Sequence, residues 1–336
     1  MSLSVGIVGL PNVGKSTLFN ALLKKQQAYV ANFPFATIEP NIGVVSVPDE
    51  RLSKLAEVTK SAESMASLPP EVPATVEFKD IAGLIEGASK GEGLGNKFLS
   101  HIRETDAICF VLRAFTDPDI IKQGVTDPKT DFEVLKVELD LADEEMTARA
   151  SAKASAGKKA PDNNNLPLFS KKPFLVVLNV DEKDLKNSSQ LEDKFSSELG
   201  VNKDQIVVIS AKTESELSEL SVEDQSAYLK DLGVEKSGLE RLIQKAFKTL
   251  GLITFLTGGE KEVRAWTIRS GLNAQEAAGV IHTDFIKKFI KADVVDFNDF
   301  VSVGGWKAAR DNGKVRSEGR DYIMKDGDVV EFKIGA

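Results

Sequence analysis

A loop near the start of the chain has the residue types and spacing that bind the phosphates of a nucleotide. Residues 9–17 read GLPNVGKST and match the pattern G-x-x-x-x-G-K-[ST]. In such a loop, backbone N–H groups surround the phosphates, Lys15 reaches the β- and γ-phosphates, and the Ser16 hydroxyl binds Mg²⁺. The residues expected to contact nucleotide are Asn12, Val13, Gly14, Lys15, Ser16 and Thr17. A glycine-rich turn without a ligand is the alternative interpretation.

The segments on either side of this loop have the patterns of the elements that must position it. An apolar run at residues 3–8 predicts a buried strand. After the loop, apolar residues recur at helical spacing from residue 18 to residue 23. A strand, a glycine loop and a helix in this order direct N–H groups and the positive end of the helix dipole at the phosphates.

Two further loops can complete a metal site. Asp80, in the sequence Asp-Ile-Ala-Gly, follows a strand-like run and can hold Mg²⁺ through water, while the N–H of Gly83 can sense a γ-phosphate. Thr37 lies where a closing loop would bring a second hydroxyl to Mg²⁺. Ordinary turn and loop residues are the alternative at these positions. Because five glycines lie within residues 83–95, that loop can change conformation at low strain when the γ-phosphate is lost.

Six strand-like apolar runs alternate with helical or irregular segments. They lie at residues 3–8, 43–47, 75–78, 108–112, 174–178 and 206–209. This alternation predicts an α/β fold with a mostly parallel, doubly wound sheet. Helical patterns at residues 214–232 and 238–250 would close this domain before the pattern changes near Leu252. Cys109 lies within one of the apolar runs, so we expect a buried structural thiol rather than a redox site.

The middle and the end of the chain carry additions to this domain. An amphipathic pattern over residues 131–149 predicts a helix, and the Ala-, Ser-, Lys- and Asn-rich residues 147–167 predict a mobile linker or a poorly ordered helical tip. The tail has a helical run at residues 274–281 and an Asp-Gly turn at residues 326–327 that indicates a hairpin. Five basic side chains within residues 306–320 form either a patch for RNA or an ordinary solvated loop.

Composition limits the class of protein. The chain has 336 residues, of which 42% are hydrophobic and 28% charged, which is typical of a soluble protein with two or more domains. A net charge of −8 argues against a general nucleic-acid coat, and no DNA partner is expected. No apolar run reaches the roughly 20 residues of a membrane span, and no signal peptide is visible. We therefore expect a cytoplasmic protein without a membrane partner.

Taken together, these motifs resemble the Obg-related translational GTPases and, within them, the YchF/Ola1 family. The resemblance covers nearly the whole chain, because it includes residues 9–17, 32–41 and 80–96 and the tail motifs VRAW (263–266) and VIHTDF (280–285). It implies that residues 1–130 and 171–251 form a G domain of P-loop NTPase type. Residues 131–170 would form a shortened coiled-coil-like helical insertion, and residues 252–336 a β-grasp TGS domain. It also implies a partnership with the ribosome or ribosomal RNA.

The resemblance also bears on the base of the nucleotide. Related GTPases read guanine with N-K-x-D, whose Asp accepts hydrogen bonds from guanine N1–H and the 2-amino group. Residues 179–182 read Asn-Val-Asp-Glu, so the lysine is missing and the longer Glu182 weakens two-point recognition of guanine. The resemblance implies that ATP is preferred over GTP. The residues expected around the base are Asn179, Val180, Glu182, Ser210, Ala211 and Lys212. The alternative to base recognition is that residues 179–182 are a polar end of a strand that binds no ligand.

The catalytic group stays unassigned. Many GTPases orient the attacking water with a Gln directly after D-x-x-G, where this chain has Leu84. The position of the family's histidine holds Lys122, so Lys122 and His101 are the candidates, although His101 is also typical of a helix surface. Asn12 lies where potassium-dependent relatives hold K⁺, which makes K⁺ a candidate cofactor beside Mg²⁺; bonding to switch backbone is the other role for Asn12.

Three functions stay open. The leading one is a switch that hydrolyses ATP, with GTP used more weakly, and presents different surfaces to the ribosome in its two nucleotide states. The second is a regulatory protein that holds nucleotide with negligible hydrolysis, which Leu84 and Lys122 would explain. The third is a P-loop kinase for a small metabolite, which the switch and base loops disfavour.

Overall fold

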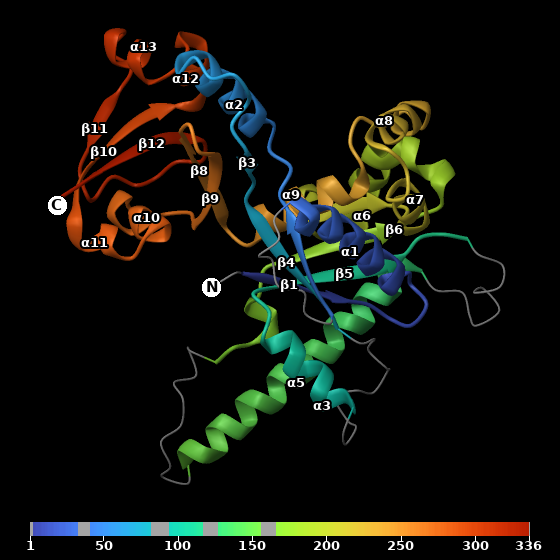
Figure 1. Cartoon of the computed structure of the whole chain (residues 1–336). Coiled ribbons are helices and arrows are strands. Elements are labelled where there is room, and N and C mark those ends of the chain that lie inside the picture. The colour runs from blue at the N-terminus through green and yellow to red at the C-terminus, as the bar shows by residue number, and fades with distance from the viewer. Residues whose placement is uncertain (1–2, 33–40, 82–93, 117–126, 156–165, 336) are drawn as a thin grey trace. The chain divides into compact units, whose positions relative to one another are not determined.

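The computed structural model describes residues 3–32, 41–81, 94–116, 127–155 and 166–335 (Figure 1). The chain divides into two compact units, one of residues 1–45 and 76–249 and the other of residues 46–75 and 250–336. Each unit contains a six-stranded sheet. None of the helices in these described segments is both long enough and apolar enough to cross a membrane.

The sheet of the first unit contains all six strands expected from the apolar runs. They are β1 (Ser4–Val8), β2 (Ile42–Ser46), β4 (Thr75–Asp80), β5 (Ala107–Arg113), β6 (Phe174–Asn179) and β7 (Ile206–Ile209), in the order β2-β4-β1-β5-β6-β7. Strand β1 pairs in parallel with β4 and β5, and β5, β6 and β7 continue in parallel. Cys109 is buried in β5, and this burial raises the pKa of its thiol to about 12. The predicted α/β sheet is confirmed.

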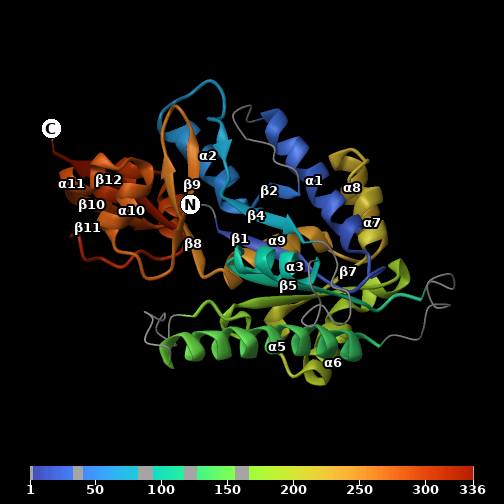
Figure 2. The ribbon, with the colours of Figure 1, turned by 90° about the horizontal axis from the view of Figure 1, so that it is seen from below.

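Helices cover both faces of this sheet. They are α1 (Lys15–Asn32), α3 (Leu94–Arg103), α5 (Pro128–Ser155), α6 (Ser188–Leu199), α7 (Ala211–Leu217), α8 (Val222–Asp231) and α9 (Gly238–Thr249), with short 3₁₀ turns η2 (Phe169–Lys171), η3 (Glu182–Asn187) and η4 (Lys203–Gln205). Helices α5 and α6 lie on one side, and α1 and α7 lie on the other (Figure 2). The helical pattern expected over residues 214–232 is interrupted, because α7 ends at Leu217 and α8 begins at Val222.

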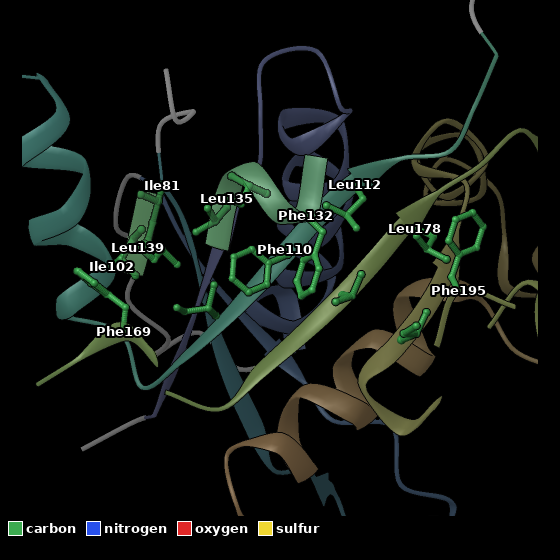
Figure 3. Close-up of a cluster of buried hydrophobic side chains, with 14 of the residues drawn as sticks. Ile81, Ile102, Phe110, Leu112, Phe132, Leu135, Leu139, Phe169, Leu178 and Phe195 are labelled. Carbon is green, nitrogen blue, oxygen red and sulfur yellow. The ribbon is translucent and has the colours of Figure 1, made fainter. Parts of the chain in front are cut away.

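The core beneath α5 explains why this helix belongs to the first unit. Phe132, Leu135 and Leu139 of α5 pack against Phe110 of β5 and Phe169 of η2 (Figure 3). The rings of Phe110 and Phe132 meet edge to face, with centroids 5.4 Å apart. Burial of these large side chains, at about 1.5–3 kcal/mol each, fixes the helix on the sheet.

Helix α5 decides between two alternatives for the start of the Ala- and Ser-rich stretch. A linker from residue 147 is wrong and a helical tip is right as far as Ser155, because the helix continues to that residue and alanine is the strongest helix former. Arg149 pairs with Glu145 one turn earlier, and Ala150 is buried. The Asp143 carboxylate accepts the backbone N–H groups of residues 169 and 170 at 2.8 and 2.9 Å, which holds the returning chain. Residues 156–165 of the expected linker lie outside the described residues.

The second unit has a mixed sheet. Its strands are β3 (Glu71–Val72), β8 (Leu252–Gly258), β9 (Val263–Arg269), β10 (Phe289–Asp296), β11 (Arg316–Glu318) and β12 (Asp328–Ile334), in the order β11-β10-β12-β8-β9-β3. The pairs β12–β8 and β3–β9 are parallel, and the others are antiparallel. Its helices are α2 (Glu50–Ala62), α10 (Ala274–Ile281), α11 (Asp284–Lys288), α12 (Phe297–Val303) and α13 (Trp306–Asp311). Helix α10 matches the expected helical run at residues 274–281.

Helix α2 comes from the N-terminal part of the chain, yet it packs within the second unit, on the opposite side of the sheet from α10 (Figure 1). Three glycines allow this approach. A Cβ at Gly258, Gly305 or Gly327 would lie 2.8–2.9 Å from a side chain of α2. These boundaries differ from the expected domains, which placed residues 46–75 in the first one. The reason is that α2 buries its apolar face on β8 and β9, and β3 extends that sheet.

The tail differs from one expectation and favours one alternative for another. The hairpin predicted at the Asp-Gly turn is wrong, because β12 pairs with β10 and β8, while the segment before the turn forms a bridge between Ile323 and Asn273. Asp326 instead accepts hydrogen bonds from the Thr254 N–H and from Arg51. In the basic segment 306–320, three of the five basic side chains are ion-paired. These pairs are Arg310 with Glu331, Lys314 with Asp299, and Arg316 with Glu318 and Asp328. This favours an ordinary surface for those three side chains.

Candidate nucleotide-binding site

The phosphate loop joins β1 to α1 and depends on two glycines. Gly14 has a φ of +90°, which strongly favours glycine. A Cβ at Gly9 would lie 2.7 Å from the carbonyl oxygen of Val111, so the loop can pack this close to β5 only without a side chain. Asn12 also has a positive φ of 63°, a conformation that asparagine adopts more easily than most residues. The loop is thus built by backbone geometry that suits close approach to an anion.

Asn179 connects three of the predicted loops. Its side-chain Nδ2 donates to the carbonyl oxygen of Val13 at 2.9 Å, and its Oδ1 accepts the backbone N–H of Ala211 at 2.9 Å. A Cβ at Gly14 would lie 2.1 Å from the same Nδ2, so a side chain there would break the connection. These bonds are buried, where they are worth most. The structure therefore brings three loops into one cluster. They are the phosphate loop, the base loop (residues 179–182) and the loop after β7.

The two residues after Asn179 are also held by specific bonds. The N–H of Val180 donates to the carbonyl oxygen of Ile209 at 2.8 Å and its side chain is buried, so this N–H is not offered to a base. The carboxylate of Asp181 accepts the N–H and hydroxyl of Thr116 at 3.1 and 2.7 Å. Partial burial tends to raise the pKa of Asp181, but the two bonds from Thr116 and the charge of Lys183 lower it on balance.

Glu182 differs from its neighbours, because it is exposed at the start of η3. Its Oε2 accepts a hydrogen bond from the hydroxyl of Tyr228 at 3.2 Å. Ser210 was expected on the other side of the base from Glu182. Its side chain caps α7 and accepts a hydrogen bond from the backbone N–H of Thr213. Lys212, two residues after Ser210, is exposed.

Asp80 meets the requirements of a metal ligand. It ends β4, and its Oδ1 is buried without a hydrogen-bond partner among the described residues. Burial raises the pKa of Asp80, and the charge of Lys15 opposes this shift. Ser16, in the first turn of α1, is exposed and offers a hydroxyl. One carboxylate and one hydroxyl fit Mg²⁺, which keeps several water ligands and needs no protein cage. In keeping with this, the described segments hold no cluster of three or more acidic, His or Cys ligands.

Some predicted residues lie outside the described residues. These are Thr37, Gly83, Leu84 and Lys122. The remaining catalytic candidate, His101, is exposed in the last turn of α3.

Two residues of this site were not found from the sequence. Thr116 follows β5 and carried no motif of its own, although the polar residue after a parallel strand is a usable signal. Tyr228 lies 46 positions from its partner in the amphipathic α8, so the sequence gives no signal for it.

Comparison with known families gives two matches that together span most of the chain. The YchF-GTPase_C model, described as a protein of unknown function, matches residues 252–335. A model described as 50S ribosome-binding GTPase matches residues 4–148.

Full-length relatives agree with these matches. The Bacillus subtilis protein named Ribosome-binding ATPase YchF is 42% identical over 371 residues, with 99% of each chain covered. The Escherichia coli O157:H7 protein of the same name is 43% identical over 369 residues, again with 99% of each covered. The solved structure of the Schizosaccharomyces pombe YchF GTPase has a TM-score of 0.82 at 35% identity and covers 99% of this chain and 98% of that one.

Proposed function

Because the chain belongs to the YchF family of P-loop proteins, we propose that it is an ATP-hydrolysing molecular switch that acts with the ribosome. The observation that carries this proposal is the full-length similarity to relatives named as ribosome-binding ATPases. The cluster around Asn179 supports it, because that cluster joins the loops expected to hold phosphate and base.

The phosphates and the metal would be held by residues at the ends of β1 and β4. Lys15 would bind the β- and γ-phosphates, and the Ser16 hydroxyl and the Asp80 carboxylate would hold Mg²⁺. Thr37 would add a second hydroxyl, and the N–H of Gly83 would sense the γ-phosphate. Bound Mg²⁺ would neutralise charge that develops on the phosphate oxygens.

The base would be selected by Glu182. Guanine presents two donors, N1–H and the 2-amino group, whereas adenine presents the 6-amino group and no N1–H. The position that reads guanine with Asp in related GTPases holds this longer side chain, and Val180 replaces the lysine that packs on the base. We therefore propose that ATP binds more tightly than GTP, which also binds.

The attacking water has no assigned partner among the described residues. His101 lies on the exposed surface of α3, and Lys122 is the other candidate. A bound K⁺ beside Asn12 would stabilise the transition state as an arginine finger does. Hydrolysis that is several-fold faster in potassium than in sodium would support this role, and equal rates in the two salts would remove it.

The ribosome is the proposed partner, and binding is expected to depend on the nucleotide state. Within the basic segment of the second unit, Lys307 and Arg320 are exposed and form no ion pair in the described part of the chain. These two side chains are the ones we expect to face RNA phosphates. The alignment with the B. subtilis relative spans 371 positions, more than the 336 residues of this chain, so this chain lacks residues that the relative has. We also propose that they are missing from the helical insertion.

Single-turnover hydrolysis of radiolabelled ATP, with and without ribosomes, tests the proposed activity. We expect release of phosphate that is faster when ribosomes are present. No turnover in either condition would leave the second candidate, a regulatory protein that only holds nucleotide. Transfer of phosphate to a metabolite instead of water would favour a small-molecule kinase.

A further inference from the structure

Tyr228 is the described residue that contacts the side chain expected to read the base. It lies on α8, and its hydroxyl donates to Oε2 of Glu182 at 3.2 Å. Burial and the charge of Glu182 both raise the pKa of Tyr228, so the hydroxyl is protonated at neutral pH and acts as the donor. The bond therefore restricts one end of an otherwise exposed carboxylate.

The backbone that carries Glu182 is already fixed. Asn179 is bonded to Val13 and Ala211, and Asp181 is held by two bonds from Thr116. The remaining freedom lies in the side chain of Glu182, which has three rotatable bonds. A partner on α8 is placed to reduce that freedom.

We propose that Tyr228 is a positioning residue that favours adenine by occupying one of the two carboxylate oxygens of Glu182. The inference rests on the proposed function, in which Glu182 faces the base. Two-point recognition of guanine needs both oxygens, one for N1–H and one for the 2-amino group. The bond from Tyr228 uses one lone pair of Oε2 and holds that oxygen toward α8, which hinders both oxygens from turning to guanine together. Oε1 is then the oxygen left to face the base, and one acceptor suits the single 6-amino group of adenine. Tyr228 thereby works against guanine more than it helps adenine.

The test compares four proteins: the unchanged chain, Tyr228→Phe, Glu182→Gln and the double variant. The dissociation constants of ATP and GTP with Mg²⁺ are measured for each by calorimetry. Phenylalanine keeps the ring and removes only the hydroxyl. We expect Tyr228→Phe to lower the ratio of ATP affinity to GTP affinity about two- to fivefold, mainly by tightening GTP. In the Glu182→Gln background the same change should have a smaller effect, since glutamine keeps one acceptor oxygen for Tyr228 but no longer offers two acceptors to guanine.

Tyr322→Phe is the matched control. Its hydroxyl bonds Asp328 at 3.0 Å in the second unit, so removing it should leave the ATP to GTP ratio unchanged. Melting temperatures of all variants report whether each is folded.

The outcomes separate this inference from the proposed function. A ratio that shifts in Glu182→Gln but not in Tyr228→Phe would overturn the role of Tyr228 and keep that of Glu182. If neither variant shifts the ratio, base reading by Glu182 itself is wrong. Equal weakening of both nucleotides in Tyr228→Phe would indicate that Tyr228 only supports α8, and would also overturn the inference.

Discussion

Two carboxylates, one in each unit, differ in how their oxygens are satisfied. In the first unit, Asp80 has a buried oxygen without a partner among the described residues. In the second, Asp293 accepts hydrogen bonds from Lys291 and Ser317, each at 2.8 Å. A buried polar group without a partner costs roughly 1–3 kcal/mol, so natural proteins keep few of them. The free oxygen of Asp80 is where the proposed Mg²⁺ would bind, whereas Asp293 is satisfied within its own unit.

Glycines show the same contrast. Gly14 leaves room for the amide of Asn179, which ties together loops that would bind nucleotide. Gly305 leaves room for Ala62 of α2, which only closes the second unit over its sheet. Similar backbone geometry thus supports a binding site in one unit and packing in the other.

Among substitutions in the first unit, Lys15→Ala should have the largest effect on nucleotide binding. Loss of the ammonium that reaches the phosphates should weaken ATP binding about 100-fold, because bonds to charged groups are the strong ones. ATP at 100 times its dissociation constant should stabilise the unchanged protein by about 2.7 kcal/mol and should stabilise the variant far less. Calorimetry and thermal unfolding with and without ATP measure both. Unchanged affinity would contradict the role of Lys15.

The next effect comes from placing the same methyl group in each unit. Gly14→Ala and Gly305→Ala both add a Cβ at positive φ, +90° and +108°, and each should cost about 1–3 kcal/mol of unfolding free energy. Only Gly14→Ala should also weaken nucleotide binding, since its Cβ would lie 2.1 Å from the Asn179 amide. Urea unfolding and ATP titration of both variants measure these effects. Equal loss of nucleotide affinity in the two variants would break the distinction.

Each unit is predictable from the sequence to the extent that its contacts join residues close together in the sequence. The six strands of the first unit and the phosphate loop follow from local periodicity and spacing, so they were predictable. Residues 46–75 were not assigned to the second unit, because β3 has only two residues and its partner β9 begins at Val263. No local pattern encodes a pairing across such a distance.

Two local rules also failed for physical reasons. The Asp-Gly turn indicated a hairpin, but Asp326 satisfies its carboxylate with Thr254 and Arg51, and the strand after it pairs elsewhere. Composition left a linker or a helical tip open after residue 147, and the linker is wrong up to Ser155, because Ala150 is buried and the helix continues. In the site, the sequence predicted Asn179 as a base contact. It could not predict the bonds of Asn179 to Val13 and Ala211, because these depend on tertiary structure.

The pKa values of Asp80 and Asp293 are shifted in opposite directions. The pKa of Asp80 is raised by burial against the charge of Lys15, so its charge costs stability above that pKa. The pKa of Asp293 is lowered by its bonds to Lys291 and Ser317, which outweigh burial, so its charge stabilises the fold above the ordinary value of 3.8.

At neutral pH and without Mg²⁺, Asp80→Asn should therefore raise the melting temperature and Asp293→Asn should lower it. Asp80→Asn should at the same time weaken binding of ATP with Mg²⁺. Thermal scans in a chelator measure the melting temperatures, and calorimetry with Mg²⁺ measures the affinity for ATP. A lower melting temperature in both variants would show that the oxygen of Asp80 has a structural partner after all.

The smallest effect is expected at Thr116, which holds the base loop through Asp181. Because Asp181 is only partly buried, Thr116→Ala should cost less than about 1 kcal/mol of unfolding free energy. The pKa of Asp181 is lowered in the folded state, so this contribution is present above the ordinary value of 3.8 and disappears as the pH falls through the lowered pKa. Urea unfolding at pH 7 and near pH 3 should show a difference that shrinks with acid. A difference independent of pH would mean that Thr116 stabilises the first unit by packing, as side chains do in the second, and not by holding a charged loop beside the nucleotide.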